Sequence, residues 1–366
     1  MRKLYIRLTV LCSIFLISSY AQQTLTTSAA FLKVSPDIRG AGLGDAGIAN
    51  TPDAYSTFRN IAKIPFAENR ASIAASYTPW MQNIANDIYM AALNGFIRLD
   101  DNQALTASLR FFKVGEATFR DDAGNYIGTF SPRDFSIDAG YSRKIAAKLG
   151  VGVTLRYINS RIASGNLNGD TYKTGSSIAG DASLYYNGIK EGSGFTAGIN
   201  LSNLGSKISY NTTNSGGFLP AALGIGVGYT IKIGEDKFTM IAEVDKTLVP
   251  VTPEDNASME AYNNMSLPES WFKSFNSGNI KWMQYKAGIE YNWNDLLFLR
   301  AGGLIDGKAR THADEKLYFT LGAGLKYKSA QVDFSLLGGD FVGTDGLPYV
   351  NTFRVGISYN IFGTAK

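Results

Sequence analysis

The sequence has almost no cysteine or histidine. Its 366 residues include one cysteine, Cys12, and one histidine, His312. A disulfide-stapled domain needs paired cysteines, and most structural or catalytic metal sites use cysteine or histidine ligands. A metal site here would need carboxylates alone, and the calcium-loop spacing of acidic residues is missing. The sequence therefore excludes a disulfide scaffold and predicts no metal or other cofactor.

The sequence also lacks a charge excess and a long apolar run. Lys and Arg number 35 against 31 Asp and Glu, whereas a nucleic-acid-binding domain usually carries a strong basic excess. Beyond the first twenty residues no apolar run reaches the roughly 18 residues of a membrane helix. Mean hydropathy is −0.06. A membrane β-barrel fits these values because its strands alternate apolar and polar residues.

The first residues have the pattern of an export signal. Three basic residues stand among the first seven, Val10–Ile17 is a short apolar core, and Ser19-Tyr20-Ala21 has small residues at the cleavage positions. A membrane anchor would need a longer apolar run. We therefore expect residues 1–21 to be a signal peptide, removed before Gln22.

A period of two dominates the chain after residue 70. In 317–327, for example, the odd positions are apolar or aromatic, while the even positions include two glycines, a threonine and a lysine. Strict alternation indicates strands between two different environments. Most of these segments run 9–14 residues, whereas soluble strands average about 5–6 and tilted membrane strands need about 9–11. The predicted strands are 70–78, 87–98, 103–115, 134–146, 150–163, 175–188, 193–203, 220–232, 237–248, 282–293, 296–305, 315–327, 330–338 and 350–362.

The connections between these segments alternate in length. Those after even-numbered strands are tight, as at Asn294-Asp295, and those after odd-numbered strands are long, as at Val249–Lys281. Outer-membrane barrels show this rhythm, with short periplasmic turns and long external loops. The sequence therefore predicts an all-β fold: a 14-stranded antiparallel transmembrane β-barrel over residues 70–366. An even strand number predicts that both termini are periplasmic.

Residues 22–69 precede the first strand and are rich in Ala and Gly. A barrel of fourteen strands is wide enough to leak unless something fills it. We therefore expect 22–69 to form a hatch, or plug, in the lumen. The inward strand faces carry both signs of charge, and we expect them to pair with one another and with the plug; a polar path is the alternative. The expected lumen charges are Arg110, Asp138, Arg156, Glu243, Arg300, Asp333 and Arg354, with Asp245, Lys286, Glu290 and Lys326 beside them.

Two motifs suggest chemistry but lack its context. Gly42–Gly47 matches G-x-G-x-x-G, yet the dinucleotide site needs a βαβ unit. Small residues that let a plug turn tightly explain it better. His312 stands in a predicted loop without a nucleophile–base pattern. We therefore predict no catalysis.

Aromatic and methionine side chains gather in the predicted external loops. They include Trp80 and Met81 before the second strand, and Trp271, Phe272 and Phe275 in the longest loop. Such residues commonly anchor protein interfaces. The sequence leaves two alternatives open: these loops bind a partner, or they fold over the barrel mouth and bury their own aromatics.

One stretch resembles a known family. Phe31–Ala49, with the following Asp53-Ala54-Tyr55-Ser56 and Asn60-Ile61-Ala62-Lys63, is similar to the start of the PorV family of the type IX secretion system. FadL-type fatty-acid transporters have a looser version, usually with Asn-Pro-Ala where this chain has Asn60-Ile61-Ala62. The likeness is specific over residues 30–66 and extends to the rest of the chain only in layout.

The resemblance implies a FadL-like barrel of fourteen strands in the bacterial outer membrane, in contact with outer-membrane lipid. It also implies an adaptor that binds the C-terminal signal domain of secreted cargo. Such proteins collect cargo at the SprA/Sov translocon and deliver it to an attachment complex with the sortase-like PorU, PorQ and PorZ. The alternative is a FadL-type transporter of hydrophobic small molecules, which would need an apolar pocket and a gap in the wall or a movable plug.

Overall fold

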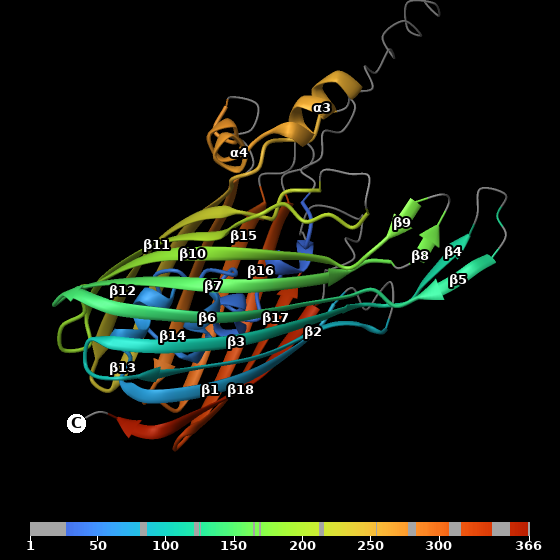
Figure 1. Ribbon diagram of the computed structural model, residues 1–366. Coiled ribbons are helices and arrows are strands. Elements are labelled where there is room, and N and C mark those ends of the chain that lie inside the picture. The colour runs from blue at the N-terminus through green and yellow to red at the C-terminus, as the bar shows by residue number, and fades with distance from the viewer. Residues whose placement is uncertain are drawn as a thin grey trace, which may run out of the picture.

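Fourteen antiparallel strands close into one barrel in the computed structural model (Figure 1). The structure describes residues 27–80, 86–120, 124, 126–163, 165–167, 170–211, 216–253, 255–276, 283–306, 316–338 and 352–364. The expected signal peptide, Met81 and His312 lie outside these residues. The barrel closes where the first and last strands pair, from Asn69 beside Thr364 to Tyr77 beside Val355.

The barrel strands follow the predicted segments closely. Each observed strand end lies within two residues of its predicted position, so the predicted fold class is confirmed. The barrel strands are β1 (Asn69–Pro79), β2 (Ile88–Arg98), β3 (Gln103–Val114), β6 (Arg133–Ala146), β7 (Leu149–Arg161), β10 (Gly175–Asn187), β11 (Gly194–Gly205), β12 (Ala222–Ile233), β13 (Asp236–Thr247), β14 (Met283–Trp293), β15 (Leu297–Asp306), β16 (Lys316–Tyr327), β17 (Ala330–Gly338) and β18 (Thr352–Thr364).

The alternation along each strand separates an apolar outer face from a polar inner face. On β6, Ser136 and Asp138 are buried inside, whereas Ile137 between them is half exposed on the outer face. Neighbouring strands are hydrogen-bonded all round the described barrel, so the wall itself leaves no unpaired edge. No described helix is long and apolar enough to cross a membrane.

The two ends of the barrel differ, and we name them by their connections. The turn end carries the tight links, and the loop end carries the long ones. At the loop end the long links form structure that the alternation did not predict: ribbons β4 (Ala117–Arg120) with β5 (Tyr126–Phe130), and β8 (Gly165–Leu167) with β9 (Asp170–Tyr172), and helices α3 (Asn256–Asn264) and α4 (Leu267–Lys273). The ribbons extend beyond the barrel rim (Figure 1).

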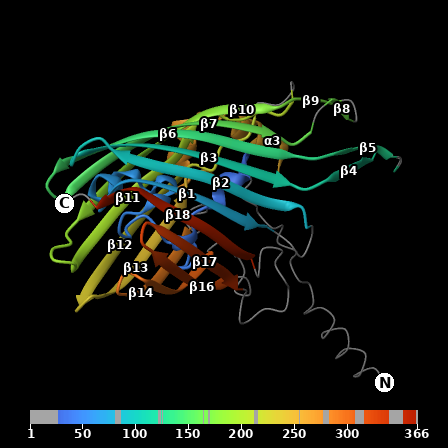
Figure 2. The same ribbon diagram turned by 90° about the horizontal axis from the view of Figure 1, so that it is seen from below.

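The segment before β1 passes through the lumen (blue in Figures 1 and 2). Its short helices are η2 (Ala30–Lys33), α2 (Ile38–Ala41), η3 (Ala54–Phe58) and η4 (Ile61–Phe66). The amide of Ser28 donates to the carbonyl of Phe218, 2.9 Å away, in the long link between β11 and β12. The described segment, residues 27–68, therefore enters at the loop end and leaves at the turn end, where β1 begins. We call it the plug.

The prediction that both termini are periplasmic stays a prediction, because residues 1–26 and 365–366 lie outside the described residues. Ser28 lies at the loop end, while Thr364 pairs with Asn69 at the turn end. The prediction assumed that an even strand number places both termini together. The start of β1 and the end of β18 do lie together at the turn end, and the described plug crosses the lumen before β1 begins.

Glycines on the inner wall let the plug backbone press against the strands. A side chain at Gly302 of β15 would collide with the backbone of Leu43 and Gly44. Gly44 itself has φ +70° and lies against the backbone of Gly303, a conformation that favours glycine. The glycines of the G-x-G-x-x-G match thus serve the tight turn and close packing of the plug.

Candidate functional site

A central charge cluster ties the plug to β14, β15 and β17. The Arg39 guanidinium of the plug lies 2.7 Å from Glu290 and 2.9 Å from Asp53. Glu290 also contacts Arg300 at 2.6 Å, and Arg300 contacts Asp333 at 2.7 Å. All but Asp53 are buried. Because buried charges are costly without partners, this alternating chain holds Arg39 against the wall.

A second charge cluster surrounds Asp45 of the plug. Asp45 lies 2.5 Å from Arg59 and 3.7 Å from Lys286 of β14. Lys286 in turn contacts Glu243 at 3.2 Å and Asp245 at 2.5 Å, both on β13. Glu243 also accepts hydrogen bonds from the plug amides of Gly47 and Ile48, each at 2.8 Å. The carboxylates of β13 therefore bind the plug both directly and through Lys286.

A third charge cluster lies on β3, β6, β7 and β10. Arg156 contacts Asp138 at 2.8 Å and Asp181 at 2.8 Å. Arg110 reaches Asp138 at a longer distance, 3.3 Å. Its guanidinium also lies over the ring of Phe58 in the plug, 5.0 Å from the centroid. This cluster is mostly within the wall and touches the plug through a cation–π contact.

The structure brings the seven predicted lumen residues together in these clusters. Arg110, Asp138, Arg156, Glu243, Arg300, Asp333 and Arg354 are each buried and each pair with a charge of opposite sign. Sequence reasoning missed the plug charges of these clusters, Arg39, Asp45 and Arg59. The signal was present, because these charges stand in a stretch otherwise rich in Ala and Gly.

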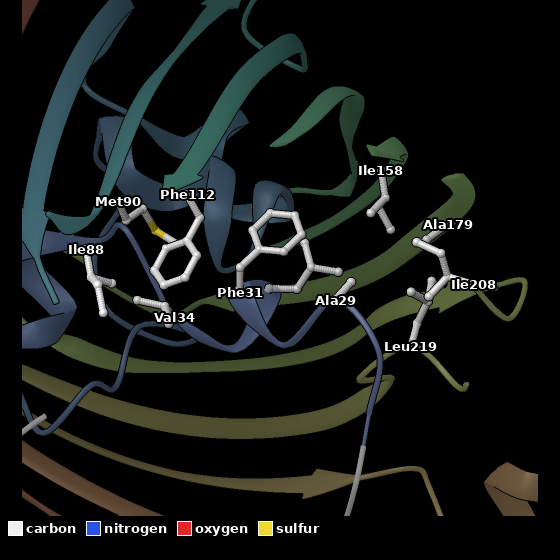
Figure 3. Close-up of a cluster of buried hydrophobic side chains, with 11 residues drawn as sticks. Ala29, Phe31, Val34, Ile88, Met90, Phe112, Ile158, Ala179, Ile208 and Leu219 are labelled. Atoms are coloured by element: carbon white, nitrogen blue, oxygen red, sulfur yellow. The ribbon is translucent and has the colours of Figure 1, made fainter. Parts of the chain in front are cut away.

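An apolar cluster closes the loop end of the lumen. Phe31, Leu32 and Val34 of the plug are buried against wall residues. The surrounding residues are Ile88, Met90, Phe112, Ile158 and Ala179 of the strands, and Ile208 and Leu219 of the link between β11 and β12 (Figure 3). Trp80 packs against this cluster and is partly buried. Trp80 therefore helps to close the barrel rather than standing free at its rim.

Within the part of the chain that the structure describes, one cavity lies towards the loop end of the lumen and another towards the turn end. The cavity towards the loop end has a volume of about 310 Å³ and is lined by Arg110, Arg156, Asp181, Lys286 and Arg354 among others. The cavity towards the turn end measures about 260 Å³ and is lined by Arg39, Glu290, Arg300 and Asp333 among others. Both linings are rich in charge, so neither is the apolar pocket expected of a carrier of hydrocarbons.

The longest loop folds into the helices α3 and α4 above the barrel (Figure 1). The Asp255 and Ser266 side chains cap their first turns by accepting from the amides of Ser258 and Glu269. A small core of Phe218, Val249, Tyr262 and Met265 fixes the helices to the rim, with Met259 and Leu267 packed against it. We call this core and its two helices the cap.

The cap leaves part of its aromatic surface in solvent. Phe272 is 77% exposed and Phe275 42% exposed, whereas Trp271 is half-buried. The first helix of the loop thus buries its aromatic residue Tyr262, whereas Phe272 on the second helix and Phe275 just after it are exposed, and partner binding by these residues stays a prediction. Met81 lies outside the described residues.

A lysine closes the lower edge of the cap. The Lys207 ammonium donates to the carbonyl of Asn263 at 2.6 Å and lies 4.3 Å from the centroid of the Phe218 ring. Burial lowers the pKa of Lys207 from its ordinary value of 10.5.

Among the described residues, no group of three His, Cys, Asp or Glu side chains is placed to hold a metal ion.

The sequence matches the family model of the type IX secretion system protein PorV over residues 17–255. The chain belongs to the PorV family. The match covers most of the chain, including the plug and β1 to β13, and the predicted family is confirmed. PorV is a family of secretion-system barrels and not an enzyme family. No curated protein sequence shows significant similarity to this chain.

The barrel is similar to solved outer-membrane channels. The toluene transporter TodX of Pseudomonas putida is 12% identical, with a TM-score of 0.53 over 87% of this chain and 96% of TodX. The monoaromatic hydrocarbon channel CymD is 13% identical, with a TM-score of 0.54 over 90% of this chain and 98% of CymD. A FadL homologue of Pseudomonas aeruginosa has a TM-score of 0.49 at 11% identity, over 93% of this chain and all of that protein. The fold comparison rests on TodX and CymD. The chain is a PorV-family outer-membrane β-barrel with a fold similar to that of TodX.

Proposed function

We propose that this PorV-family barrel is a non-catalytic adaptor that binds secreted cargo at its loop end. In this proposal it recognises the C-terminal signal domain of the cargo, receives it at the SprA/Sov translocon and passes it to the attachment complex with PorU, PorQ and PorZ. The loop end then faces outward, and the turn end, with the C-terminus, faces the periplasm. Membership of the PorV family supports the assignment to the type IX secretion system. The cap is the candidate surface for binding the cargo.

The exposed aromatic face of α4 carries this proposal. Phe272 lies on α4 and Phe275 in the turn that follows it, and the buried core of Phe218, Val249, Tyr262 and Met265 already fixes this part of the loop. An aromatic side chain held in place loses little entropy on binding, and such residues supply most of an interface's energy. Neither ring belongs to the buried core of the cap, although the Lys246 ammonium lies 5.9 Å from the centroid of the Phe275 ring, so the exposure of Phe272 above all fits a partner better than it fits stability.

The plug supports an adaptor rather than an open channel. Charge clusters bind it to β13, β14 and β15, and the apolar cluster of Phe31, Leu32 and Val34 closes the loop end. Removing the plug would separate buried charges from their partners, at a cost of several kcal/mol per ion.

The test changes Phe272 and Phe275 together to Ala in the full-length chain. We expect normal barrel assembly, and binding of cargo C-terminal domains at least tenfold weaker, as measured by surface plasmon resonance with the protein in nanodiscs. Tyr126→Ala is the matched control, because Tyr126 is 63% exposed on the ribbon of β4 and β5, which lies at the same end of the barrel but away from α4 (Figure 1). Unchanged cargo binding by the double variant would move the interface away from α4.

The likeness to TodX and CymD favours a second candidate, a transporter of hydrophobic small molecules. The charged linings of both cavities count against it, as does the continuous hydrogen bonding between neighbouring strands of the described barrel. Toluene uptake into liposomes holding the protein separates the two. Uptake above that of empty liposomes would favour the transporter.

A further inference from the structure

The arginines of the lumen differ in how well they are paired. Arg39 makes five hydrogen bonds of 2.7–3.0 Å to Glu290, Asp53 and Thr51. Arg156 is likewise bonded to Asp138, Asp181 and Asn203. These two guanidiniums have most of their donors satisfied, as a buried arginine requires.

Arg110 and Arg354 are poorly paired by comparison. Within the described part of the chain, the one hydrogen bond of Arg110 runs to Asp138 at 3.3 Å, and Asp138 is already bound closely by Arg156. The bonds of Arg354 run to the Ser35 carbonyl at 3.3 Å and to Asp45 at 3.5 Å. Asp45 is already bound at 2.5 Å by Arg59. Each of the two arginines therefore shares a carboxylate that a nearer cation holds.

Unsatisfied polar atoms accompany both arginines. Arg110 is 4% exposed, Arg354 6% and Ser335 5%. The Nε atoms of both arginines and the Ser335 hydroxyl have no hydrogen-bond partner among the described residues. Ser335 and Arg354 are opposite each other in the pairing of β17 with β18. Such groups are rare in folded proteins and call for an explanation.

All three side chains line the cavity at the loop end. Its lining includes six basic side chains and three carboxylates, whereas the turn-end cavity has four basic side chains and five carboxylates. Arg300, which also has one unpartnered nitrogen, lines only the turn-end cavity and contacts two carboxylates closely. The poorly paired cations thus lie at the cavity where basic groups predominate.

Neither Arg110 nor Arg354 has a carboxylate of its own, and water alone would not supply one. A cavity of about 310 Å³ has room for several water molecules, which would supply hydrogen bonds but no negative charge. A carboxylate or phosphate group supplies both, and it matches the planar fork of donors on a guanidinium.

We propose that the loop-end cavity binds a small oxyanion, a carboxylate or phosphate group, between Arg110 and Arg354, with Ser335 as a further donor. The site is independent of the cargo surface on α4. Its occupant joins β3 and β18, which β1 and β2 separate in the wall, and it lies beside the plug, because Arg354 also contacts Ser35 and Asp45 of the plug. Binding should therefore stabilise the plugged barrel.

The test titrates the full-length protein in detergent with sodium phosphate or with sodium acetate, at constant ionic strength set by sodium chloride. Thermal unfolding and isothermal titration calorimetry report binding. We expect a saturable rise in the melting temperature with at least one of the two anions, and the anion that acts identifies the chemistry of the site. Dissociation constants should rise at least tenfold in Arg110→Gln and in Arg354→Gln.

Three features keep this test decisive. Asp138 and Asp45 retain other cations in the two variants, so the barrel should still fold. Ser335→Ala is a milder variant, expected to weaken binding two- to fivefold without changing a charge. Arg143→Gln on the exposed surface of β6 is the control and should bind like the unchanged chain. No saturable effect of either anion beyond chloride, or equal affinity in all variants, would overturn the proposal.

Discussion

The two ends of the barrel begin from the same strands and are built differently. At the turn end, Asn294 and Asp295 both have positive φ, at 51° and 52°, and join β14 to β15 directly. At the loop end the connections form two ribbons and the two helices of the cap. Barrel closure needs no more than the short turns, as the turn end demonstrates. The additional structure at the loop end therefore serves something other than the barrel.

The lumen shows a related difference. Near the loop end the plug begins with buried apolar side chains, Phe31, Leu32 and Val34. Deeper in the lumen it is held by charges, chiefly Arg39 and Asp45. An apolar contact tolerates small shifts, whereas close charge pairs demand a fixed geometry. We therefore expect the charge clusters around Arg39 and Asp45, the charged middle of the plug, to hold the plug in the lumen. The structures at the loop end should determine which partner the protein binds.

The largest effect should follow from Glu290→Ala. The change leaves Arg39 without its wall partner and removes one of two partners from Arg300, so we expect a loss of about 3–5 kcal/mol of unfolding free energy. Urea unfolding in detergent micelles measures it. Glu269→Ala is the control, because its ion pair with Lys273 is 47% exposed on both sides and should contribute less than about 0.5 kcal/mol. Equal effects would contradict the importance of the charged middle.

A smaller and local effect should follow from Phe218→Ala. Phe218 is 3% exposed and packs edge-on against Tyr262 with centroids 5.3 Å apart. Its loss should cost the cap about 3 kcal/mol and leave the strands unchanged. Hydrogen exchange, compared between α3 and the barrel strands, measures both. Phe272→Ala should leave exchange in α3 unaltered, and a strand-wide effect of Phe218→Ala would contradict a separately folded cap.

Gly302→Ala should have a more modest effect. The new methyl group would meet the backbone of Leu43 and Gly44, and we expect overpacking to cost about 1–3 kcal/mol. Protease resistance of the plug and single-channel conductance in planar bilayers measure its displacement. Gly180→Ala on β10 is the control, because the added methyl group would meet only an ordinary contact at 3.4 Å.

The smallest effect concerns pH. Because burial lowers the pKa of Lys207, folding of the cap favours its neutral form. This contribution is fully present above the ordinary value of 10.5 and is lost as pH falls through the lowered pKa. The cap should therefore gain slight stability as pH rises towards 10.5, as measured by hydrogen exchange in α3 after correction for the intrinsic exchange rate. Lys207→Gln should abolish this dependence.

The strands could be predicted because the membrane and the lumen impose opposite demands on alternate residues. A shift of one residue would place Asp138 in lipid and Ile137 in the polar interior, so the pattern determines the register. The lumen charges could be predicted for the same reason. Their partners could not, because the contact of Arg39 with Glu290 joins residues 251 positions apart.

Two features could not be predicted from the sequence: the close contact between the plug backbone and the strands, and the helices that the longest loop forms. Gly302 occupies the inner face as any small residue would, and only the plug explains why it has no side chain. The loop helices are too short to show a clear helical period. The prediction for Phe272 and Phe275 as partner-binding residues remains to be tested, and their exposure distinguishes them from Trp80, which helps to seal the barrel.

Site-specific photocrosslinking tests the contrast between the two ends most directly. A photoreactive phenylalanine is placed at Phe272 or Phe275 at the loop end, and at Ile233 at the turn end, which is 69% exposed. In actively secreting cells we expect protein adducts from positions 272 and 275 and none from position 233. Adducts from position 233 alone would contradict the assignment of the partner surface to the loop end.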